Sequence, residues 1–494
     1  MTPPPRGVVA AGHPLSAEAG ADALRAGGNA VDAALGAMLT SFVAEPLLTG
    51  LGAGGYMLVV TPAGEATLLD FFVEAPGRGA DAARRAPLVP VDVSFGDAVQ
   101  RFNVGAASVG AYGVPAGVHA AAERFGSLPL ADLAAPAARH ARQGVAVTPE
   151  QGYIFEILAP ILASTAEASA LLAPEGRPLR AGERCVQPEL AEALERLARD
   201  GPAPFYTGEV ADAVVARLAA EGGSLTGADL EAYEVLDRAP VRVGYRGREV
   251  LTNPPPSAGG ILLAYALAVL DSAPGPPLLA AVIEAMERAQ GERTPEFLAG
   301  LARPDFLEAF LADRLGSTTH ISVLDADGWA CSVTCSNGAS SGVVVPGTGI
   351  HLNNMMGEED LNPLGFHRHP PGRRMPSMMA PTVVLGEGRP ELVLGSAGSN
   401  RIRSAILQTI VGVVDHDLAA GPAVKRPRVH LEAGTLYAEP GVPEDELEAS
   451  GWPLARFRAL NVFFGGVQAA ERDAVTGAFS GGGDPRRGGA AVVV

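Results

Sequence analysis

The sequence predicts a layered α/β sandwich rather than a doubly wound parallel sheet. Helical and strand-like segments are grouped along the chain, with Ala-rich helical patterns over residues 106–235 and strand patterns after position 318. Hydrophobic residues make up 47% of the 494 residues and charged residues 19%, so the chain can form a large core. A chain of this length is expected to build two or three units or one large layered domain.

The first part of the chain predicts two helices and a strand. Residues 16–27 begin with a serine, carry Arg25 late and end at the glycine pair 27–28, which is typical of a short capped helix. Residues 29–43 are apolar on nearly all sides, so this helix is expected to be buried. A glycine-rich loop from Gly50 then leads into a strand that ends at Val60.

The second part predicts mostly strands. Asp325-Ala-Asp-Gly328 is a hairpin turn signal between two alternating runs, 319–324 and 329–334. The glycine-rich tail after Gly481 is expected at the surface. Further strands are expected at 242–252 (a pair), 381–385 and 391–394, and helices after Gly260 and over 401–414.

Charge and cysteine content exclude several classes of protein. The net charge is −18, from 37 Lys and Arg against 55 Asp and Glu, which gives no support to nucleic-acid binding. Three cysteines, at 185, 331 and 335, cannot form a disulfide framework and are expected to be buried thiols. The apolar run 30–44 is interrupted by Asp32 and is too short to span a bilayer. With no visible signal peptide, we expect a cytoplasmic protein without membrane partners.

Two glycine motifs match known signatures in letters but not in context. Gly50-x-Gly52-x-x-Gly55 follows a helix and precedes a strand, whereas a dinucleotide-binding loop follows a strand and precedes a helix. We therefore interpret these glycines as residues that allow close backbone packing at a helix-to-strand turn. Gly338-x-Ser340-x-Gly342 leads into a β-branched run instead of the helix of a nucleophile elbow, and an α/β serine hydrolase is the alternative. Neither a metal nor an organic cofactor is predicted.

Thr318-Thr319-His320 begins one of the predicted strands. A threonine hydroxyl is a poor nucleophile until a base removes its proton, and the α-amine of a chain-terminal threonine can be that base. The α-amine has a reference pKa of about 7.7–8.0, so a useful fraction is neutral at physiological pH. This interpretation requires the chain to be cut before Thr318.

Seven segments together carry a resemblance to the γ-glutamyltransferase family, from near Gly7 almost to the C-terminus. The matching segments are Gly27-Gly-Asn-Ala-Val-Asp-Ala-Ala34, Gly52-Ala-Gly-Gly55, Gly201-Pro-Ala-Pro-Phe-Tyr206, Pro254-Pro-Pro-Ser-Ala-Gly-Gly260, Thr318-Thr-His-Ile-Ser322, Leu352-Asn-Asn354 and Gly395-Ser-Ala-Gly-Ser399. The resemblance implies an N-terminal-nucleophile hydrolase with a four-layer αββα sandwich. Such a precursor cuts itself, here into residues 1–317 and 318–494, and the two chains remain one folded unit.

The resemblance also implies roles for individual residues. Thr318 matches the family's nucleophile, and Ser336 stands where a threonine hydrogen-bonds the nucleophile's amine. The backbone N–H groups of Gly398 and Ser399 match the oxyanion hole, in which one such donor is typically worth about 2.7–4 kcal/mol. A catalytically inactive family member that serves as a binding protein remains an alternative.

The departures from the family pattern lie where the family holds the glutamyl α-carboxylate and α-amine. Phe72 occupies the place of an arginine, and Ser377-Met378 replaces a pair of serines. The acid that binds the α-amine appears as Glu358. An asparagine of the family falls on Gly338, although Asn337 is adjacent.

These residues predict the hydrolysis of γ-glutamyl or related acyl amides through an acyl-threonine intermediate, with weak transfer to amino-acid acceptors. The loss of the arginine leads us to expect weak γ-glutamyl turnover and small discrimination against glutaryl amides, and a glutaryl-type acylase is the alternative substrate class. Residues 359–376 form a shorter segment than in family members that carry a lid, so an open pocket is expected. The only partner expected besides the substrate is the other half of the same precursor.

Overall fold

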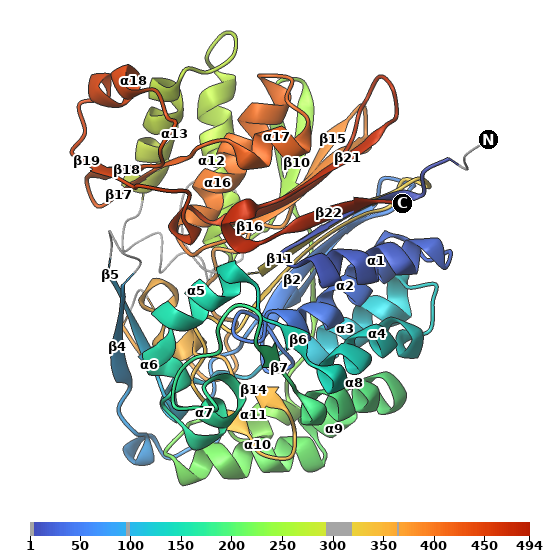
Figure 1. Ribbon diagram of the computed structural model, residues 1–494, viewed down its shortest axis with the longest axis vertical. Coiled ribbons are helices and arrows are strands. Elements are labelled where there is room, and N and C mark those ends of the chain that lie inside the picture. The colour runs from blue at the N-terminus through green and yellow to red at the C-terminus, as the bar shows by residue number, and fades with distance from the viewer. Residues whose placement is uncertain (1–3, 95–98, 293–318, 363–364) are drawn as a thin grey trace.

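The computed structural model describes residues 4–94, 99–292, 319–362 and 365–494. In this part of the chain two β-sheets lie face to face, and α-helices cover the outer face of each sheet (Figure 1). This arrangement confirms the four-layer αββα sandwich.

The first sheet has seven strands among the described residues, and each strand is antiparallel to its neighbours. In sheet order the strands are β22 (Ala490–Val493), β1 (Gly7–Ala11), β11 (Thr319–Asp325), β12 (Ala330–Ser336), β2 (Gly54–Val60), β3 (Ala66–Phe71) and β8 (Leu236–Arg238). Strands from both sides of position 318 therefore build this sheet.

The second sheet has six described strands, again antiparallel throughout. In sheet order they are β21 (Phe479–Gly483), β20 (Gly466–Arg472), β16 (Arg389–Ala397), β15 (Thr382–Gly386), β10 (Arg248–Thr252) and β9 (Val241–Tyr245). It too combines strands from both sides of position 318.

Because side chains alternate along the strands, the two described sheets enclose one hydrophobic core between them and carry another on each outer face. Between the sheets, Leu58 of β2 and Leu324 of β11 pack in one core with Val393 of β16. The outer face of the first sheet packs under α1 (Pro14–Arg25), α2 (Ala30–Ala44), α3 (Val114–Phe125), α4 (Leu130–Gln143) and α8 (Pro188–Asp200). The outer face of the second sheet packs under α12 (Ala258–Asp271), α13 (Leu279–Gly291), α16 (Arg401–Val414) and α17 (Ala420–Lys425).

Further helices and small sheets of two or three strands surround this frame. The helices are α5 (Pro149–Ile157), α6 (Ala159–Leu162), α7 (Ala166–Leu172), α9 (Ala203–Tyr206), α10 (Glu209–Ala220), α11 (Gly227–Glu231) and α18 (Glu444–Ala449). The strands are β4 (Val89–Ser94), β5 (Val99–Val104), β6 (Val145–Ala146), β7 (Arg184–Cys185), β13 (Val344–Val345), β14 (Ile350–His351), β17 (Val429–Glu432), β18 (Thr435–Ala438) and β19 (Leu454–Arg456).

Local polar contacts explain where α2 begins. Asn29 and Asp32 form a capping box, in which each side chain accepts a hydrogen bond from the backbone N–H of the other. Asp325, in the turn between β11 and β12, accepts the N–H groups of Trp329 (2.9 Å) and Ala30 (2.9 Å). The motif around Asn29 therefore ties α2 to the hairpin that begins next to position 318.

The expectation of a surface tail after Gly481 is wrong. Residues 481–483 end β21, Asp484 is fully buried, and β22 forms an edge of the first sheet. A Cβ at Gly483 would lie 2.5 Å from Cα of Ala490, and closer still to its nitrogen. The glycines therefore allow β21 and β22, which belong to different sheets, to approach closely.

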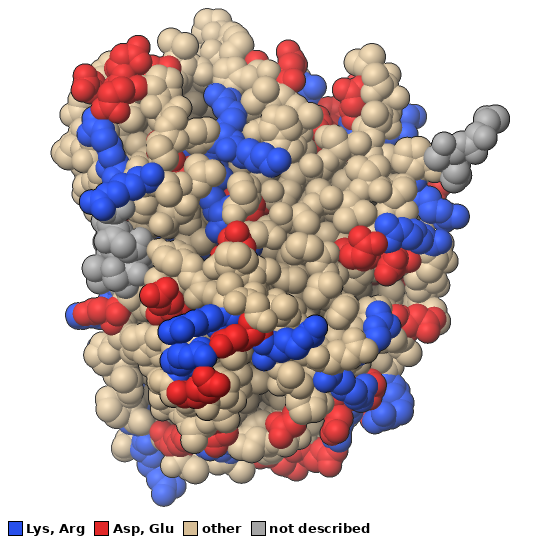
Figure 2. Space-filling model, in the orientation of Figure 1, with Lys and Arg blue, Asp and Glu red and all other residues tan. Residues whose placement is uncertain are grey.

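The surface carries charges of both signs. On the face drawn in Figure 2, Lys and Arg side chains lie interspersed with Asp and Glu and form no continuous basic band. None of the described helices is long and apolar enough to cross a membrane. The three cysteines are free and buried, as expected.

Candidate active site

The described chain resumes at Thr319, the residue after the predicted nucleophile. Thr319 begins β11, pairs with Cys335 of β12, and has β1 on the other side of its strand. Thr318 and the cut expected before it lie outside the described residues, so both stay predictions. What the structure shows is the frame in which residue 319 is held.

His320, the second residue of β11, faces the second sheet. Its Nδ1 lies 2.7 Å from Oγ1 of Thr334, and its Nε2 lies 2.8 Å from Oγ of Ser322. Burial lowers the pKa of His320 to about 3, so the ring is neutral at physiological pH. A Cβ at Gly395 would lie 2.8 Å from Nε2 of this ring, and closer still to Nδ1 and Cε1. The beginning of β11 therefore lies beside the end of β16, whose last residue is Ala397.

Ser336 is the last residue of β12 and is 1% exposed. It pairs with Gly54 of β2, and its Oγ accepts the N–H of Gly338 at 2.7 Å. Its position at the strand end fits the predicted contact with the nucleophile's amine, and that role stays a prediction.

Gly398 and Ser399 form the turn between β16 and α16, with φ of 115° and 55°. Their carbonyl groups accept the N–H groups of Arg401 and Ile402, each at 3.1 Å, so the turn runs directly into the helix. A Cβ at Gly398 would lie 2.6 Å from Cα of Gly465, which leaves room only for glycine. The turn has the geometry in which adjacent backbone N–H groups can be presented at a helix start; their oxyanion role remains predicted.

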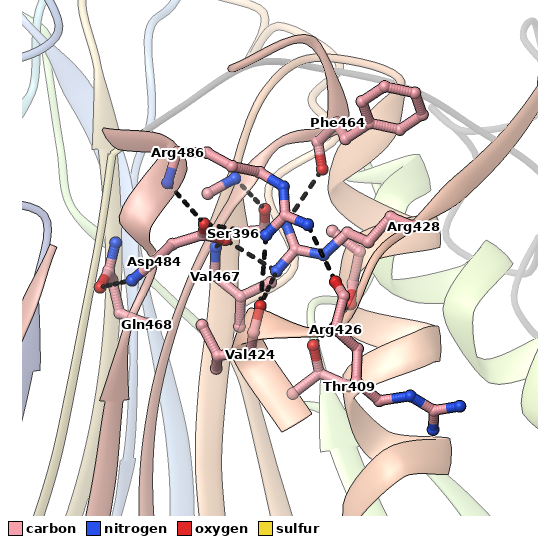
Figure 3. A network of polar contacts seen from close by, with 12 residues as sticks. Ser396, Thr409, Val424, Arg426, Arg428, Phe464, Val467, Gln468, Asp484 and Arg486 are labelled. Atoms are coloured by element: carbon pink, nitrogen blue, oxygen red, sulfur yellow. Dashed lines mark hydrogen bonds and ion pairs between the residues drawn. The ribbon is translucent and has the colours of Figure 1, made fainter. Parts of the chain in front are cut away.

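A buried cluster of charges supports the strand that packs on this turn (Figure 3). Asp484 lies 2.7 Å from Arg428 and 3.1 Å from Arg486, and it accepts the N–H of Val467 at 2.8 Å. Burial alone would raise the pKa of Asp484, but the two guanidinium groups outweigh burial and lower it. The ionised carboxylate therefore holds the beginning of β20, directly after Gly465.

A second group of polar residues surrounds Glu358. Its Oε1 accepts the N–H of Ala339 at 3.1 Å. Gly338 has a φ of 66°, and a Cβ there would lie 2.8 Å from this oxygen and still closer to Oδ1 of Asn354. Glycine therefore stands at 338, where the family has asparagine, because Asn354 and Glu358 fill the space of a side chain. Asn337 is fully buried beside them, and its N–H donates to the carbonyl of Leu48 at 3.0 Å.

Phe72 lies in the core between the sheets. It is 1% exposed and its ring stacks on Tyr56 with centroids 5.4 Å apart. Its carbonyl accepts hydrogen bonds from the hydroxyl of Tyr233 (2.7 Å) and from Nη1 of Arg374 (2.5 Å). The position of the family's arginine is therefore occupied by an apolar side chain packed against another aromatic ring.

Arg374, which donates to the Phe72 carbonyl, and Arg78 already have acidic partners. Arg374 lies 3.3 Å from Asp70 and 3.7 Å from Glu74, and its guanidinium stacks over the ring of Tyr233. Arg78 lies 3.5 Å from Glu74 and 3.6 Å from a buried aspartate, Asp229. Both cations are therefore neutralised within the protein.

Ser377 and Met378 lie at the N-terminus of α12. The carbonyl of Ser377 accepts the N–H of Ala258 (2.7 Å) and the hydroxyl of Ser257 (3.1 Å), while its Oγ accepts the N–H of Met379 (3.0 Å). Met378 packs in the core under the second helical layer. These contacts hold the backbone of Ser377 against the N-terminus of α12.

The two glycine motifs have structural roles. A strand, β13, follows Gly338-x-Ser340-x-Gly342, so the motif is not a nucleophile elbow. Ser340 nevertheless has a φ of 79° and is hydrogen-bonded to Nε2 of His351, whose Nδ1 contacts the carbonyl of Pro46 at 3.0 Å. Since Ser340 is fully buried, this pair holds the turn in place. At Gly52, a Cβ would lie 3.1 Å from the carbonyl carbon of His351, which confirms close packing.

Among the described residues no group of three or more His, Cys, Asp or Glu side chains could hold a metal ion. Sequence reasoning also missed Glu45, which is hydrogen-bonded to Thr319, and Arg487, whose charge acts on Glu45. The only signal for Glu45 was a carboxylate directly after the apolar run 30–44.

Comparison with known proteins identifies the family. The family model described as gamma-glutamyltranspeptidase matches residues 16–315 and 304–494. The chain belongs to this family. As a gamma-glutamyltranspeptidase-family protein it is an enzyme of the N-terminal-nucleophile hydrolase superfamily.

Relatives within the gamma-glutamyltranspeptidase family carry two kinds of name. "Acylase ACY 1 proenzyme" of Pseudomonas sp. (strain V22) is 34% identical over 479 residues, covering 90% of this chain and 86% of the relative. "Glutathione hydrolase proenzyme" of Bacillus subtilis (strain 168) is 30% identical over 543 residues, covering 98% and 91%. Among solved structures, a cephalosporin acylase from Bacillus halodurans is 28% identical with a TM-score of 0.84, covering 99% of this chain and 96% of that one.

Proposed function

We propose that this chain is a self-cleaving acyl-amide hydrolase that works through an acyl-threonine intermediate. A cut between Ser317 and Thr318 frees the α-amine of Thr318. This amine takes the proton from the side-chain hydroxyl of the same residue. The hydroxyl oxygen attacks the substrate carbonyl, the C–N bond breaks, and the leaving amine departs with a proton. Water then hydrolyses the ester and releases the acid. The N–H groups of Gly398 and Ser399 stabilise the oxyanion in both steps.

The observation that carries this proposal is a set of buried polar atoms without protein partners. Both amide atoms of Asn337 and Oδ1 of Asn354 are buried and have no hydrogen-bond partner among the described residues. Oδ1 of Asn354 lies beside Gly338, where Oε1 of Glu358 also converges, and Nδ2 of the preceding residue, Asn337, lies near Gly50. Buried polar groups are nearly always hydrogen-bonded, so a polar ligand is the natural partner here. An ammonium group has three donors and no acceptor, which suits these oxygens.

The residues at the family's carboxylate-binding position offer no comparable partner for the α-carboxylate of a γ-glutamyl substrate. Phe72 is apolar, and the nearby Arg78 and Arg374 are engaged by acidic side chains. A hydrogen bond to a charged group contributes about 1.5–3 kcal/mol, or roughly 10–150-fold. We therefore expect the α-carboxylate of a γ-glutamyl substrate to contribute little to kcat/KM. The α-amine of the same substrate is expected to raise kcat/KM through its contacts with Glu358 and the two asparagines.

Four p-nitroanilides separate these contributions: γ-glutamyl, 4-aminobutanoyl (no carboxylate), glutaryl (no amine) and butanoyl (neither). We expect kcat/KM for the γ-glutamyl and 4-aminobutanoyl anilides to agree within about tenfold. Any preference for the γ-glutamyl over the glutaryl anilide should not exceed the roughly 10–150-fold that the α-amine alone can contribute. A preference of several hundredfold for γ-glutamyl over 4-aminobutanoyl requires a cation that binds the carboxylate and contradicts this account. Thr318→Ala is the inactive control for all four.

A glutaryl-type acylase is the second candidate function. It is favoured by the names of two similar proteins, an acylase and a cephalosporin acylase, and by the apolar Phe72 and Met378. In the same panel this alternative predicts that glutaryl is the best of the four substrates. A catalytically inactive binding protein predicts no turnover of any anilide and no difference between wild type and Thr318→Ala.

A further inference from the structure

We propose that Glu45 and Arg487 are positioning residues that align the beginning of β11 with the Gly398–Ser399 turn. Glu45 acts on Thr319, the neighbour of the proposed nucleophile, and Arg487 acts on the backbone that packs against the turn. The proposal rests on the proposed function, because it concerns the relative placement of the proposed nucleophile and oxyanion donors.

Glu45 follows the last residue of α2 and is 5% exposed. Its carboxyl group is hydrogen-bonded to the side chain of Thr319. A Cβ at Gly12, just after β1, would lie 2.5 Å from Oε1 of Glu45, so the carboxyl group packs directly on this backbone. Oε2 is buried and has no hydrogen-bond partner among the described residues. One carboxyl group thus joins α2, the end of β1 and the beginning of β11.

Arg487 belongs to the C-terminal segment and packs on the beginning of β20. A Cβ at Gly466 would lie 2.8 Å from Nε of Arg487, and closer still to Cδ, so the side chain packs on the first residue of β20. The preceding residue, Gly465, is the one that packs on Gly398. Its charge also acts on Glu45: burial raises the pKa of Glu45 to about 7 and lowers the pKa of Arg487 to about 10, and the attraction between the two groups opposes both shifts.

The pair connects the two sheets at the end where β11 begins. Thr319 belongs to the first sheet, and Gly466 belongs to the second. A further titratable group beside Glu45 is Cys335 of β12, whose pKa burial raises to about 12, so it stays neutral. Besides burial and Glu45, two more charged groups act on the pKa of Arg487: Asp484 raises it and Arg401 of α16 lowers it. Since a displacement of about 1 Å can cost roughly 100-fold in rate, a contact of this kind matters for turnover.

The test uses the full-length protein with Glu45→Ala, Glu45→Gln and Thr319→Val, and with Glu195→Gln as matched control. Glu195 is an exposed carboxylate paired with Arg142 on the surface. We expect Glu45→Ala and Thr319→Val to slow self-cleavage and to lower kcat about 10- to 100-fold, with KM within about twofold. Glu45→Gln keeps an acceptor for the Thr319 hydroxyl and should recover most of kcat, but with an altered pH dependence between pH 5 and 8. Glu195→Gln should match wild type in every measurement.

The proposal is overturned if Thr319→Val and Glu45→Ala cleave and turn over substrate within about twofold of wild type at all pH values. It is also overturned if KM rises while kcat is kept, because that result would place Glu45 in substrate binding. Should Glu45→Ala fail to fold, Thr319→Val and the pH profile of Glu45→Gln decide. Failure of the proposed function is a separate outcome, since wild type itself would then be uncut or inactive.

Discussion

The imidazole ring of His320 lies over Gly395 so closely that no side chain fits at position 395. His320 belongs to β11 and Gly395 to β16, so this contact joins the two sheets. It lies one residue into β11 on one side and two residues before Ala397 on the other. The packing of this ring therefore helps to fix how the proposed nucleophile's strand and the proposed oxyanion turn are aligned.

Gly395→Ala should disturb this alignment. The added Cβ would lie 2.8 Å or less from three ring atoms of His320, closer than a real contact allows. Overpacking of this kind typically costs about 1–3 kcal/mol, so we expect the free energy of unfolding to fall by that amount and kcat to fall with it. Gly244→Ala, where a Cβ meets nothing within 4 Å, is the control. Equal denaturant midpoints for the two variants would contradict the packing argument.

Asp484→Asn should destabilise the protein strongly. The change leaves Arg428 and Arg486 buried without this anion, and breaking a buried ion pair costs about 3–5 kcal/mol. Because the pKa of Asp484 is lowered in the folded state, its contribution is present above the unfolded pKa and is lost as the pH falls through the folded pKa. Urea unfolding at pH 7 measures the effect, and Asp92→Asn on the surface should leave the midpoint nearly unchanged.

Glu45→Gln should change how stability depends on pH. Burial raises the pKa of Glu45 from 4.5 to about 7, so the folded state holds a proton that the unfolded state releases between these values. Wild-type stability attributable to this group therefore falls as the pH rises from about 4.5 to 7. At about 1.4 kcal/mol per pH unit, the variant should gain on the order of 3 kcal/mol relative to wild type between pH 4.5 and pH 8. Parallel stability curves for the two proteins would show that folding does not raise the pKa of Glu45.

Water should be the main acceptor for the acyl-enzyme. Only residues 359–376 separate Glu358 from Ser377, and family members that carry a lid have a longer segment there. We expect free glutamate to exceed the glycylglycine adduct at all but the highest acceptor concentrations. The measurement is product analysis over a range of dipeptide concentrations. A strong rate increase by dipeptide, with the adduct as main product, would show that an acceptor site exists.

Most of the fold could be predicted from local patterns. The Asp325–Gly328 turn, the buried helix that begins after Asn29 and the helix over Arg401–Val414 all carry their own capping, turn or periodicity signals, and the structure confirms each. The segment after Gly481 was misjudged because glycine-rich composition resembles a surface tail. Its glycines instead permit two strands of different sheets to pack closely, which depends on residues far away in the chain.

The candidate site was predictable only where it follows a motif. Ser336, Gly398 and Glu358 were found through the resemblance, and the structure places them at strand ends or in turns. The reason for glycine at 338 could not be read from the sequence, because it depends on the packing of Asn354 and Glu358. The partners of Arg374 and the contact of Glu45 with Thr319 also join distant segments, which periodicity and spacing do not report.

The intact mass and the N-terminal sequence of the purified wild-type protein test the central claim most directly. The account predicts two polypeptides, residues 1–317 and 318–494, with Thr318 as the new N-terminal residue, and a single uncut chain without activity for Thr318→Ala. A wild-type protein that hydrolyses an acyl amide while wholly uncut, or that is cut at another bond and remains active, would contradict the mechanism through a free threonine amine.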